Sequence, residues 1–216
     1  MRFPNAYKGI KKIFLGEIMA VAVVVLTVGM AAVLSAYGVG TDADLADLTR
    51  EQALLIGGLS LGLLLAAGVL AVAGLILNFT GVVQAKKDDS HFNTAFFTAL
   101  LSLVIGFLGS FLLRNAPEIQ RWVRIGGAVC GIMTQFFILS GIASLAEKMV
   151  DGKVRAMAEK ARVIVCAVSI VSNLAGLIDD YLPDAVSLKY VSYALSIGIS
   201  LYYLTVLAKA KKMLAG

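Results

Sequence analysis

The chain has 216 residues, of which 59% are hydrophobic and 15% are charged. Soluble domains carry about 25% charged residues, so this composition excludes an ordinary soluble globular domain. The net charge of +5 would suggest a nucleic-acid partner in a soluble protein, but here the basic residues stand at the ends of hydrophobic runs, which is the pattern of membrane topology. We therefore expect an all-α, multi-pass integral membrane protein with a single membrane domain over residues 1–216, surrounded by lipid and without a nucleic-acid partner.

Six hydrophobic runs follow one another, and each is a predicted transmembrane helix. The longest, residues 53–85, has no charged residue in thirty-three positions. A bilayer core is about 30 Å thick and needs about 20 helical residues, so this run is long enough to cross it with a tilt or a bend. The predicted spans of this helical bundle are residues 13–37, 53–85, 92–113, 125–146, 163–178 and 190–208.

The interval between the fourth and fifth spans is the longest polar stretch in the chain. Residues 147–162 predict an amphipathic helical link around Gly152. The fifth span has only sixteen uncharged residues, about 24 Å of helix, so we expect Arg162 at its start to extend toward the lipid head groups.

The basic residues predict the orientation. If the N-terminus is cytoplasmic, six spans return the C-terminus to the same side, and fourteen of the nineteen lysines and arginines then lie inside. Short cytoplasmic loops are enriched in lysine and arginine, so both termini are predicted to be cytoplasmic in the cell (plasma) membrane.

The inner ends of the even-numbered spans share a pattern. Threonine, four residues, alanine and two lysines occur at 80–87 and again at 205–212. One interpretation is that the chain consists of three weakly similar hairpins, since internal repeats are common in transporters. The other is that small residues followed by lysines end many helices at the cytoplasmic face, and the sequence leaves both open.

Glu17 is the acidic residue inside the first span. It lies five residues beyond Lys12, roughly 7 Å into the apolar zone, where an ionised carboxylate costs about 2–3 kcal/mol unless it is paired, protonated or hydrated. One interpretation is a proton- or cation-coupling acid with Asn78, at a similar depth, as its polar partner. The alternative is that Glu17 pairs with a nearby lysine or interacts with the helix N-terminal dipole.

Polar and small residues recur every three or four positions in the last two spans, so each set shares one helix face. In the fifth span the set is Cys166, Ser169, Asn173, Gly176 and Asp180. In the sixth span the set is Lys189, Ser192, Ser196, Ser200 and Tyr203. Facing each other, the two sets would line a cavity that opens outward; alternatively, they let the two helices pack closely.

Two further spans carry ridges of small residues, which predict helix-packing surfaces. In the second span the ridge is Gly58, Gly62 and Ala66, and in the third it is Thr94, Thr98, Ser102, Gly106 and Ser110. Gln135, near the middle of the fourth span, is either a ligand contact or part of a hydrogen bond between helices.

Catalytic and metal-binding patterns have little support in the sequence. His91 is the single histidine, and Cys130 and Cys166 each lie inside a hydrophobic run. A disulfide, a zinc site or a histidine-based catalytic triad is therefore not expected. We predict no enzyme activity, no cofactor and no metal.

Three functions are consistent with these features. The first is transport of a small solute or ion, or service as the membrane-embedded substrate-binding subunit of a transporter; in span number and topology alone the chain resembles the vitamin-binding subunits of energy-coupling importers. The second is a non-transporting scaffold or regulatory subunit that binds another membrane protein or a second copy of itself. The third is an ion channel. The candidates for ligand or ion binding are Glu17, Asn78, Gln135, Asn173, Asp180 and Ser196.

Overall fold

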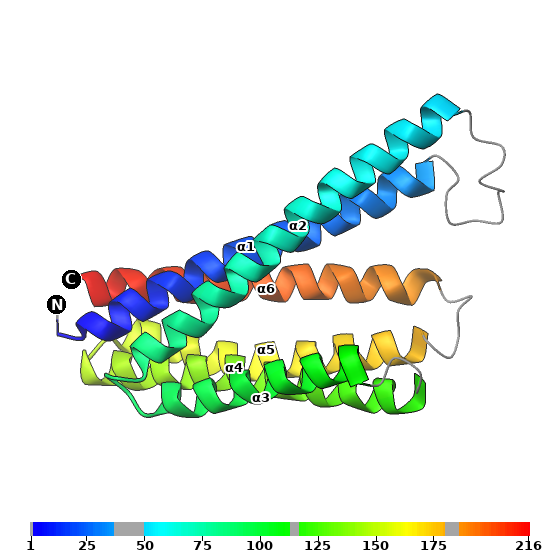
Figure 1. Cartoon of the computed structure of the whole chain (residues 1–216). Coiled ribbons are helices and arrows are strands. Elements are labelled where there is room, and N and C mark those ends of the chain that lie inside the picture. Colours follow the sequence, from blue (N-terminus) through cyan, green and yellow to red (C-terminus); the bar gives the residue numbers. More distant parts are fainter. Residues whose placement is uncertain (1, 37–49, 113–116, 180–185) are drawn as a thin grey trace. The chain divides into compact units, whose positions relative to one another are not determined.

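The computed structural model describes residues 2–36, 50–112, 117–179 and 186–216, and every regular element in those ranges is an α-helix. The six helices are α1 (Pro4–Ala36), α2 (Arg50–Ala85), α3 (His91–Leu112), α4 (Pro117–Lys148), α5 (Gly152–Asp179) and α6 (Val186–Ala215) (Figure 1). The prediction of an all-α fold is confirmed for this part of the chain. Asp180, one of the predicted site residues, lies outside the described residues.

Four of the helices are long and apolar enough to cross a membrane. Over the described residues these segments are Pro4–Leu34, Ile56–Ala85, His91–Gly109 and Ile119–Lys148. They indicate a multi-pass membrane protein. The helices also continue beyond the predicted hydrophobic runs, with α1 beginning at Pro4 and α6 ending at Ala215, because lysine and arginine are good helix formers.

The chain divides into two compact units that share α1 and α2. Unit 2 is the hairpin formed by residues Leu15–Leu77. Its helices approach closely at Gly74, where an added Cβ would lie 3.1 Å from the carbonyl oxygen of Gly16. Large aliphatic side chains of this hairpin, such as Leu65 and Val69, are exposed, as expected for a surface that contacts lipid.

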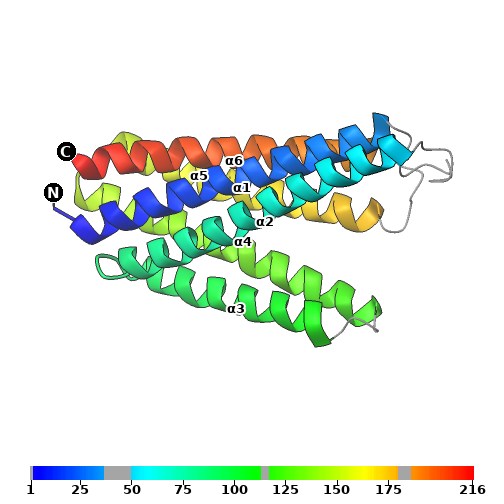
Figure 2. The ribbon, with the colours of Figure 1, turned by 45° about the horizontal axis from the view of Figure 1, so that its top comes forward.

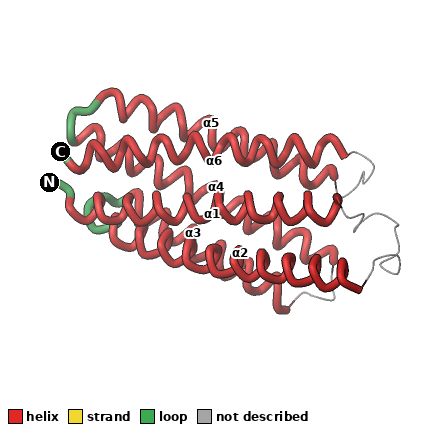
Figure 3. Tube along the Cα trace, turned by 90° about the horizontal axis from the view of Figure 1, so that it is seen from above, coloured by secondary structure: helices red, strands yellow, loops and turns green. Residues whose placement is uncertain are grey.

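Unit 1 contains residues Met1–Phe14 and Asn78–Gly216. Its helices α3, α4, α5 and α6 pack in sequence order, each against the next, and α4 also touches α6 (Figures 1 and 2). The start of α1 and the end of α6 lie side by side (Figure 3), together with the links 86–90 and 149–151. We call this the terminal end of unit 1 and the opposite end the far end.

The hydrophobic core of unit 1 gathers at its terminal end. The largest fully buried side chains are Ile10, Ile13, Val82, Phe92, Leu139, Ile142, Leu145, Val165, Tyr203, Val206, Leu207 and Leu214. Toward the far end, the described side chains of α4 before Ile138 and of α6 before Tyr203 are half-buried or exposed. Packing is therefore dense at one end of the unit and looser at the other.

Two glycines allow α1 and α2 to cross in unit 1. A Cβ at Gly9 would lie 2.5 Å from the carbonyl oxygen of Gly81, and a Cβ at Gly81 would lie 2.7 Å from that of Gly9. Because each glycine faces the backbone of the other helix, neither position has room for a side chain. Small residues at helix contacts are typical of membrane bundles.

The turn between α4 and α5 differs from the predicted helical link around Gly152. Val150 has a φ of 61°, its N–H donates to the carbonyl of Glu147 at 3.0 Å, and the N–H of Asp151 donates to the carbonyl of Ala146 at 2.9 Å. This pair of hydrogen bonds is the Schellman motif, which ends a helix with one left-handed residue. Valine, rather than glycine, occupies the left-handed position here, and Gly152 is the first residue of α5.

Candidate functional site

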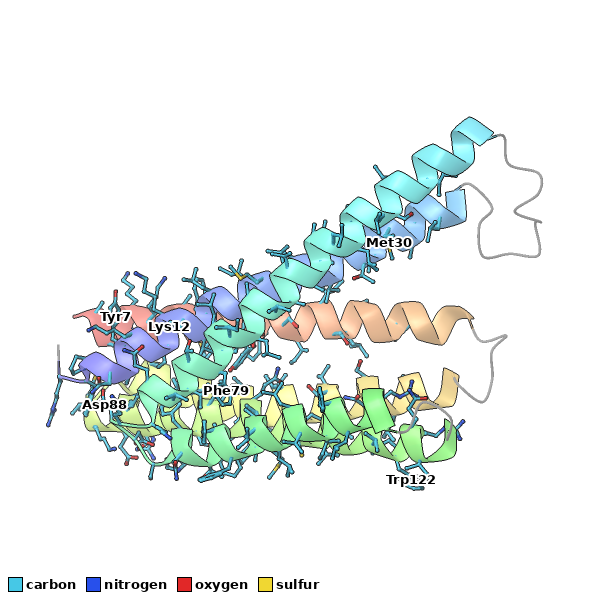
Figure 4. The ribbon with its side chains drawn as sticks, viewed as in Figure 1. Tyr7, Lys12, Met30, Phe79, Asp88 and Trp122 are labelled. Atoms are coloured by element: carbon cyan, nitrogen blue, oxygen red, sulfur yellow. The ribbon has the colours of Figure 1, made fainter. Side chains whose placement is uncertain are left out.

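Three helices begin at the terminal end, and an aspartate caps each of them. The residue before α1 is Phe3, whose side chain cannot accept a hydrogen bond. The link residue Asp88 supplies the cap instead: its Oδ2 accepts from the Ala6 N–H at 2.7 Å, and its Oδ1 accepts from the Asn5 amide at 3.0 Å (Figure 4). A carboxylate at this position also interacts favourably with the helix dipole.

The other two caps are local. Asp89 Oδ1 accepts from the His91 N–H at 3.0 Å at the start of α3. Asp151 Oδ1 accepts from the N–H groups of Lys153 and Val154, at 3.2 and 3.0 Å, at the start of α5. The three aspartates therefore satisfy backbone donors that a helix start leaves without partners in the helix.

Asp89 is also the centre of a polar network between α3 and α4. Its side chain is only 2% exposed. Oδ2 accepts from Ser144 Oγ and from Lys148 Nζ, both at 2.7 Å, and Oδ1 lies 2.9 Å from Nδ1 of His91. The link after α2 is thus tied to the last turns of α4.

The hydrogen bonds that Asp89 accepts favour its ionised form. Burial alone would raise the pKa of this carboxyl, but hydrogen bonds from Lys148, Ser144 and His91 outweigh it and lower the pKa from 3.8 to about 2. The carboxylate therefore stays ionised near neutral pH and cannot relay protons there. Its role is to hold α3 and α4 together.

The sequence analysis missed this network. It considered His91 only as the single histidine, without partners for a zinc site or a catalytic triad. The available signal was the Asp88–Asp89 pair directly before a predicted helix, since aspartate is a preferred N-cap residue.

Cations at the terminal end lie over aromatic rings. Lys86 Nζ is 4.1 Å from the ring centroid of Phe96, and the Arg162 guanidinium carbon is 5.0 Å from that of Phe136. Arg162 Nη1 also donates to Ser140 Oγ at 3.5 Å. Arg162 is thus in contact with α4, rather than only extending toward the lipid head groups as expected from the sequence.

Three contacts of hydroxyl side chains between helices lie farther from the terminal end than the Asp89 network does. The hydroxyl oxygens of Ser172 in α5 and Ser196 in α6 are 2.8 Å apart, and those of Thr98 in α3 and Thr134 in α4 are 3.0 Å apart. The third contact is from Ser102 Oγ to the carbonyl oxygen of Gly127, at 3.2 Å. The contacts of Thr98 and Ser102 agree with the packing role predicted for the ridge in the third span.

The described polar contact between α5 and α6 joins Ser196, a member of the predicted set of α6, to Ser172, which is not in the predicted set of α5. Ser196 contacts Ser172, whereas Asn173 is exposed and its amide donates to the Ser169 carbonyl of its own helix at 2.7 Å. Successive residues on a helix point about 100° apart, so Ser172 and Asn173 face different neighbours.

The remaining predicted site residues belong to three different helices: Glu17 to α1, Asn78 to α2 and Gln135 to α4. Gln135 is half-buried in α4, next to Thr134, and Asn78 is half-buried in the part of α2 that belongs to unit 1. Glu17 is half-buried in unit 2. Ligand binding by these residues, and the partnership of Glu17 with Asn78, stay predictions.

The ridge predicted in the second span is open. A Cβ placed on Gly58 or Gly62 would meet nothing within 4 Å, and Ala66 is exposed. These residues lie in unit 2, where Gly74 makes the close helix contact instead.

Within the described ranges, no group of three or more histidine, cysteine or acidic residues is placed to hold a metal ion. No protein-family model, curated protein or solved structure matches the chain. A functional proposal therefore depends on the geometry of the Asp89 network and of the Ser172–Ser196 contact.

Proposed function

We propose that the chain is a six-span carrier, or the membrane-embedded binding subunit of a transporter, for a small polar solute. The observation that carries this proposal is the asymmetry of unit 1. Its terminal end holds the buried core and the Asp89 network, whereas its far half has looser packing and includes the Ser172–Ser196 contact. A binding subunit that is closed to the cytoplasm and accessible from outside would have this distribution.

The proposed topology places both termini in the cytoplasm of a cell membrane. The two termini and the links 86–90 and 149–151 share one end of unit 1, as six crossings would require. Helices α5 and α6 contain 28 and 30 residues, so each is about 40 Å long or more and exceeds the thickness of a bilayer core. Both pack beside α4, which supports a transmembrane path for them.

The test is ligand-induced stabilisation of the purified chain. A panel of metabolites and inorganic ions is screened for compounds that raise the melting temperature, because a ligand that binds only the folded state stabilises it in proportion to its occupancy. We expect at least one small polar solute to do so. A null result over a broad panel would count against a solute-binding role.

The identified solute would then be tested on two matched α6 variants. Ser196→Ala removes a hydroxyl at the α5–α6 contact, and we expect it to weaken binding by about fivefold or more, the free-energy equivalent of one lost hydrogen bond. Thr205→Ala is the control, because this exposed hydroxyl donates to the Tyr202 carbonyl of its own helix at 2.6 Å. Equal effects of the two variants would exclude Ser196 from the binding site.

The second candidate is a scaffold or regulatory subunit, and the open ridge at Gly58 and Gly62 favours it. Small residues that face open space allow a partner helix to approach closely in lipid. If this function is correct, another membrane protein co-purifies after mild detergent extraction, and Gly62→Leu abolishes co-purification without lowering the melting temperature. Recovery of the chain alone would count against it.

A further inference from the structure

Six lysines gather where α1 begins and α6 ends, and we call them the lysine cluster. Contact between the two helices is direct here, because Lys211 Nζ of α6 lies 4.4 Å from the ring centroid of Phe14 in α1. The sequences of α1 up to Gly16 and of all of α6 contain no acidic residue. The members of the cluster are Lys8, Lys11, Lys12, Lys209, Lys211 and Lys212.

Five carboxylates at this end bind groups other than the lysine cluster. Asp88 caps α1, Asp151 caps α5, and Asp89 pairs with Lys148. Glu147 and Glu159 both pair with Arg155, each at 2.9 Å. The described partners of these five acids are therefore groups other than the six lysines of the cluster.

The helix dipoles explain only half of the cluster. Lys209, Lys211 and Lys212 lie near the C-terminus of α6, where cations are favoured. Lys8, Lys11 and Lys12 lie in the second and third turns of α1, toward the helix end that favours anions. Their spacings of three and four place them on one face, and that face is opposite the buried residues Ile10 and Ile13.

We propose that the lysine cluster binds the head group of an anionic phospholipid in the cytoplasmic leaflet. Lysines at a membrane surface attract anionic lipids, and basic sites between helices at the cytoplasmic face suit phosphate-bearing head groups. Lys8 and Lys11 are exposed and lie beside a hydrophobic span that the acyl chains of the same lipid can contact. The proposal requires the membrane embedding and orientation given above, but it does not depend on solute binding.

The experiment measures lipid binding to the purified full chain by native mass spectrometry. Dioleoyl phosphatidylglycerol and dioleoyl phosphatidylcholine are added separately at equal concentration, and we expect the first to bind in preference. The variant Lys8→Gln/Lys11→Gln/Lys12→Gln should bind phosphatidylglycerol at least about tenfold more weakly, since each lysine near an anionic surface contributes about fivefold.

The matched control removes the same number of charges from exposed positions outside the cluster: Lys87→Gln/Lys153→Gln/Lys160→Gln. It should keep the wild-type preference for phosphatidylglycerol. Equal loss in the two triple variants, or equal binding of the two lipids by the wild-type chain, would overturn the proposal.

Two further measurements keep the proposal testable. Lys209→Gln/Lys212→Gln alters only exposed positions of α6 and should also weaken binding, which covers the case in which the α1 variant does not fold. Inorganic phosphate at millimolar concentration should fail to displace phosphatidylglycerol. Full displacement by phosphate would assign the cluster to a soluble anion and refute a lipid site.

Discussion

At the scale of single residues, Asp89 is the position on which the terminal end depends most. A buried carboxylate is destabilising unless partners compensate for its lost hydration. Asp89 receives hydrogen bonds from a lysine, a serine and a backbone N–H, and it lies against the His91 ring. Its neighbour Asp88 caps α1.

The substitution Asp89→Asn removes the charge while nearly keeping the shape. We expect it to lower the free energy of unfolding by about 2 kcal/mol, because the charge-assisted hydrogen bond with Lys148 is lost while Lys148 can regain water. Thermal unfolding of the detergent-purified chain measures this. The control Glu159→Gln breaks an exposed pair with Arg155 and should change the melting temperature little.

The Asp89 carboxylate also predicts that the stability of the fold depends on pH. The pKa of Asp89 is lowered from 3.8 to about 2 by folding, so its contribution is fully present above pH 4 and is lost as the pH falls from about 4 to about 2. The shift corresponds to about 2 kcal/mol. The melting temperature of wild type should therefore fall more steeply below pH 4 than that of Asp89→Asn; parallel curves would contradict the assignment.

A substitution at Val150, in contrast to the one at Asp89, is expected to stabilise the fold. A valine at φ 61° is strained, and the residue is 89% exposed, so little packing is lost when its side chain is removed. Val150→Gly should raise the free energy of unfolding by about 1 kcal/mol. Val150→Ala, which keeps a Cβ at the same φ, should gain less. A decrease with glycine would show that the valine side chain has a stabilising contact.

At the scale of helices, hydrophobic runs predicted where the elements lie, but not which faces meet. Within the described residues, the six runs fall inside the six helices because run length and the absence of charge determine a helix in lipid. The described contact between α5 and α6 uses Ser172, which lies outside the polar face predicted for the fifth span. A periodic polar stripe does not say whether it faces a helix, lipid or a cavity, so this part of the candidate site could not be predicted.

The glycines also show that a small-residue face in the sequence does not reveal whether it contacts another helix. Gly9 and Gly62 both belong to hydrophobic or small-residue faces, but only Gly9 lies against another backbone. We expect Gly9→Ala to lower the free energy of unfolding by about 2–3 kcal/mol through overpacking, whereas Gly62→Ala should be neutral or slightly stabilising. Thermal unfolding of both variants checks this. Equal destabilisation would contradict the α1–α2 crossing described here.

At the scale of the whole molecule, the arrangement of charge supports one orientation. The helices that start at the terminal end, α1, α3 and α5, carry aspartate caps, and two of those that end there, α4 and α6, carry a lysine in the last turn; both arrangements match the helix dipole. The lysine cluster of α1 and α6 adds further positive charge at the same end. An end with this excess of basic residues is expected on the cytoplasmic side of a membrane.

The most direct test is labelling with a membrane-impermeant maleimide in intact cells. In a background where Cys130 and Cys166 are alanine, single cysteines are placed at Lys87, Lys153 and Gly216 at the terminal end and at Gln120 near the far end, all exposed positions. The proposed topology predicts labelling at position 120 alone, with the other three labelled only after the membrane is permeabilised. Labelling of positions 87 and 120 to the same extent in intact cells would contradict it.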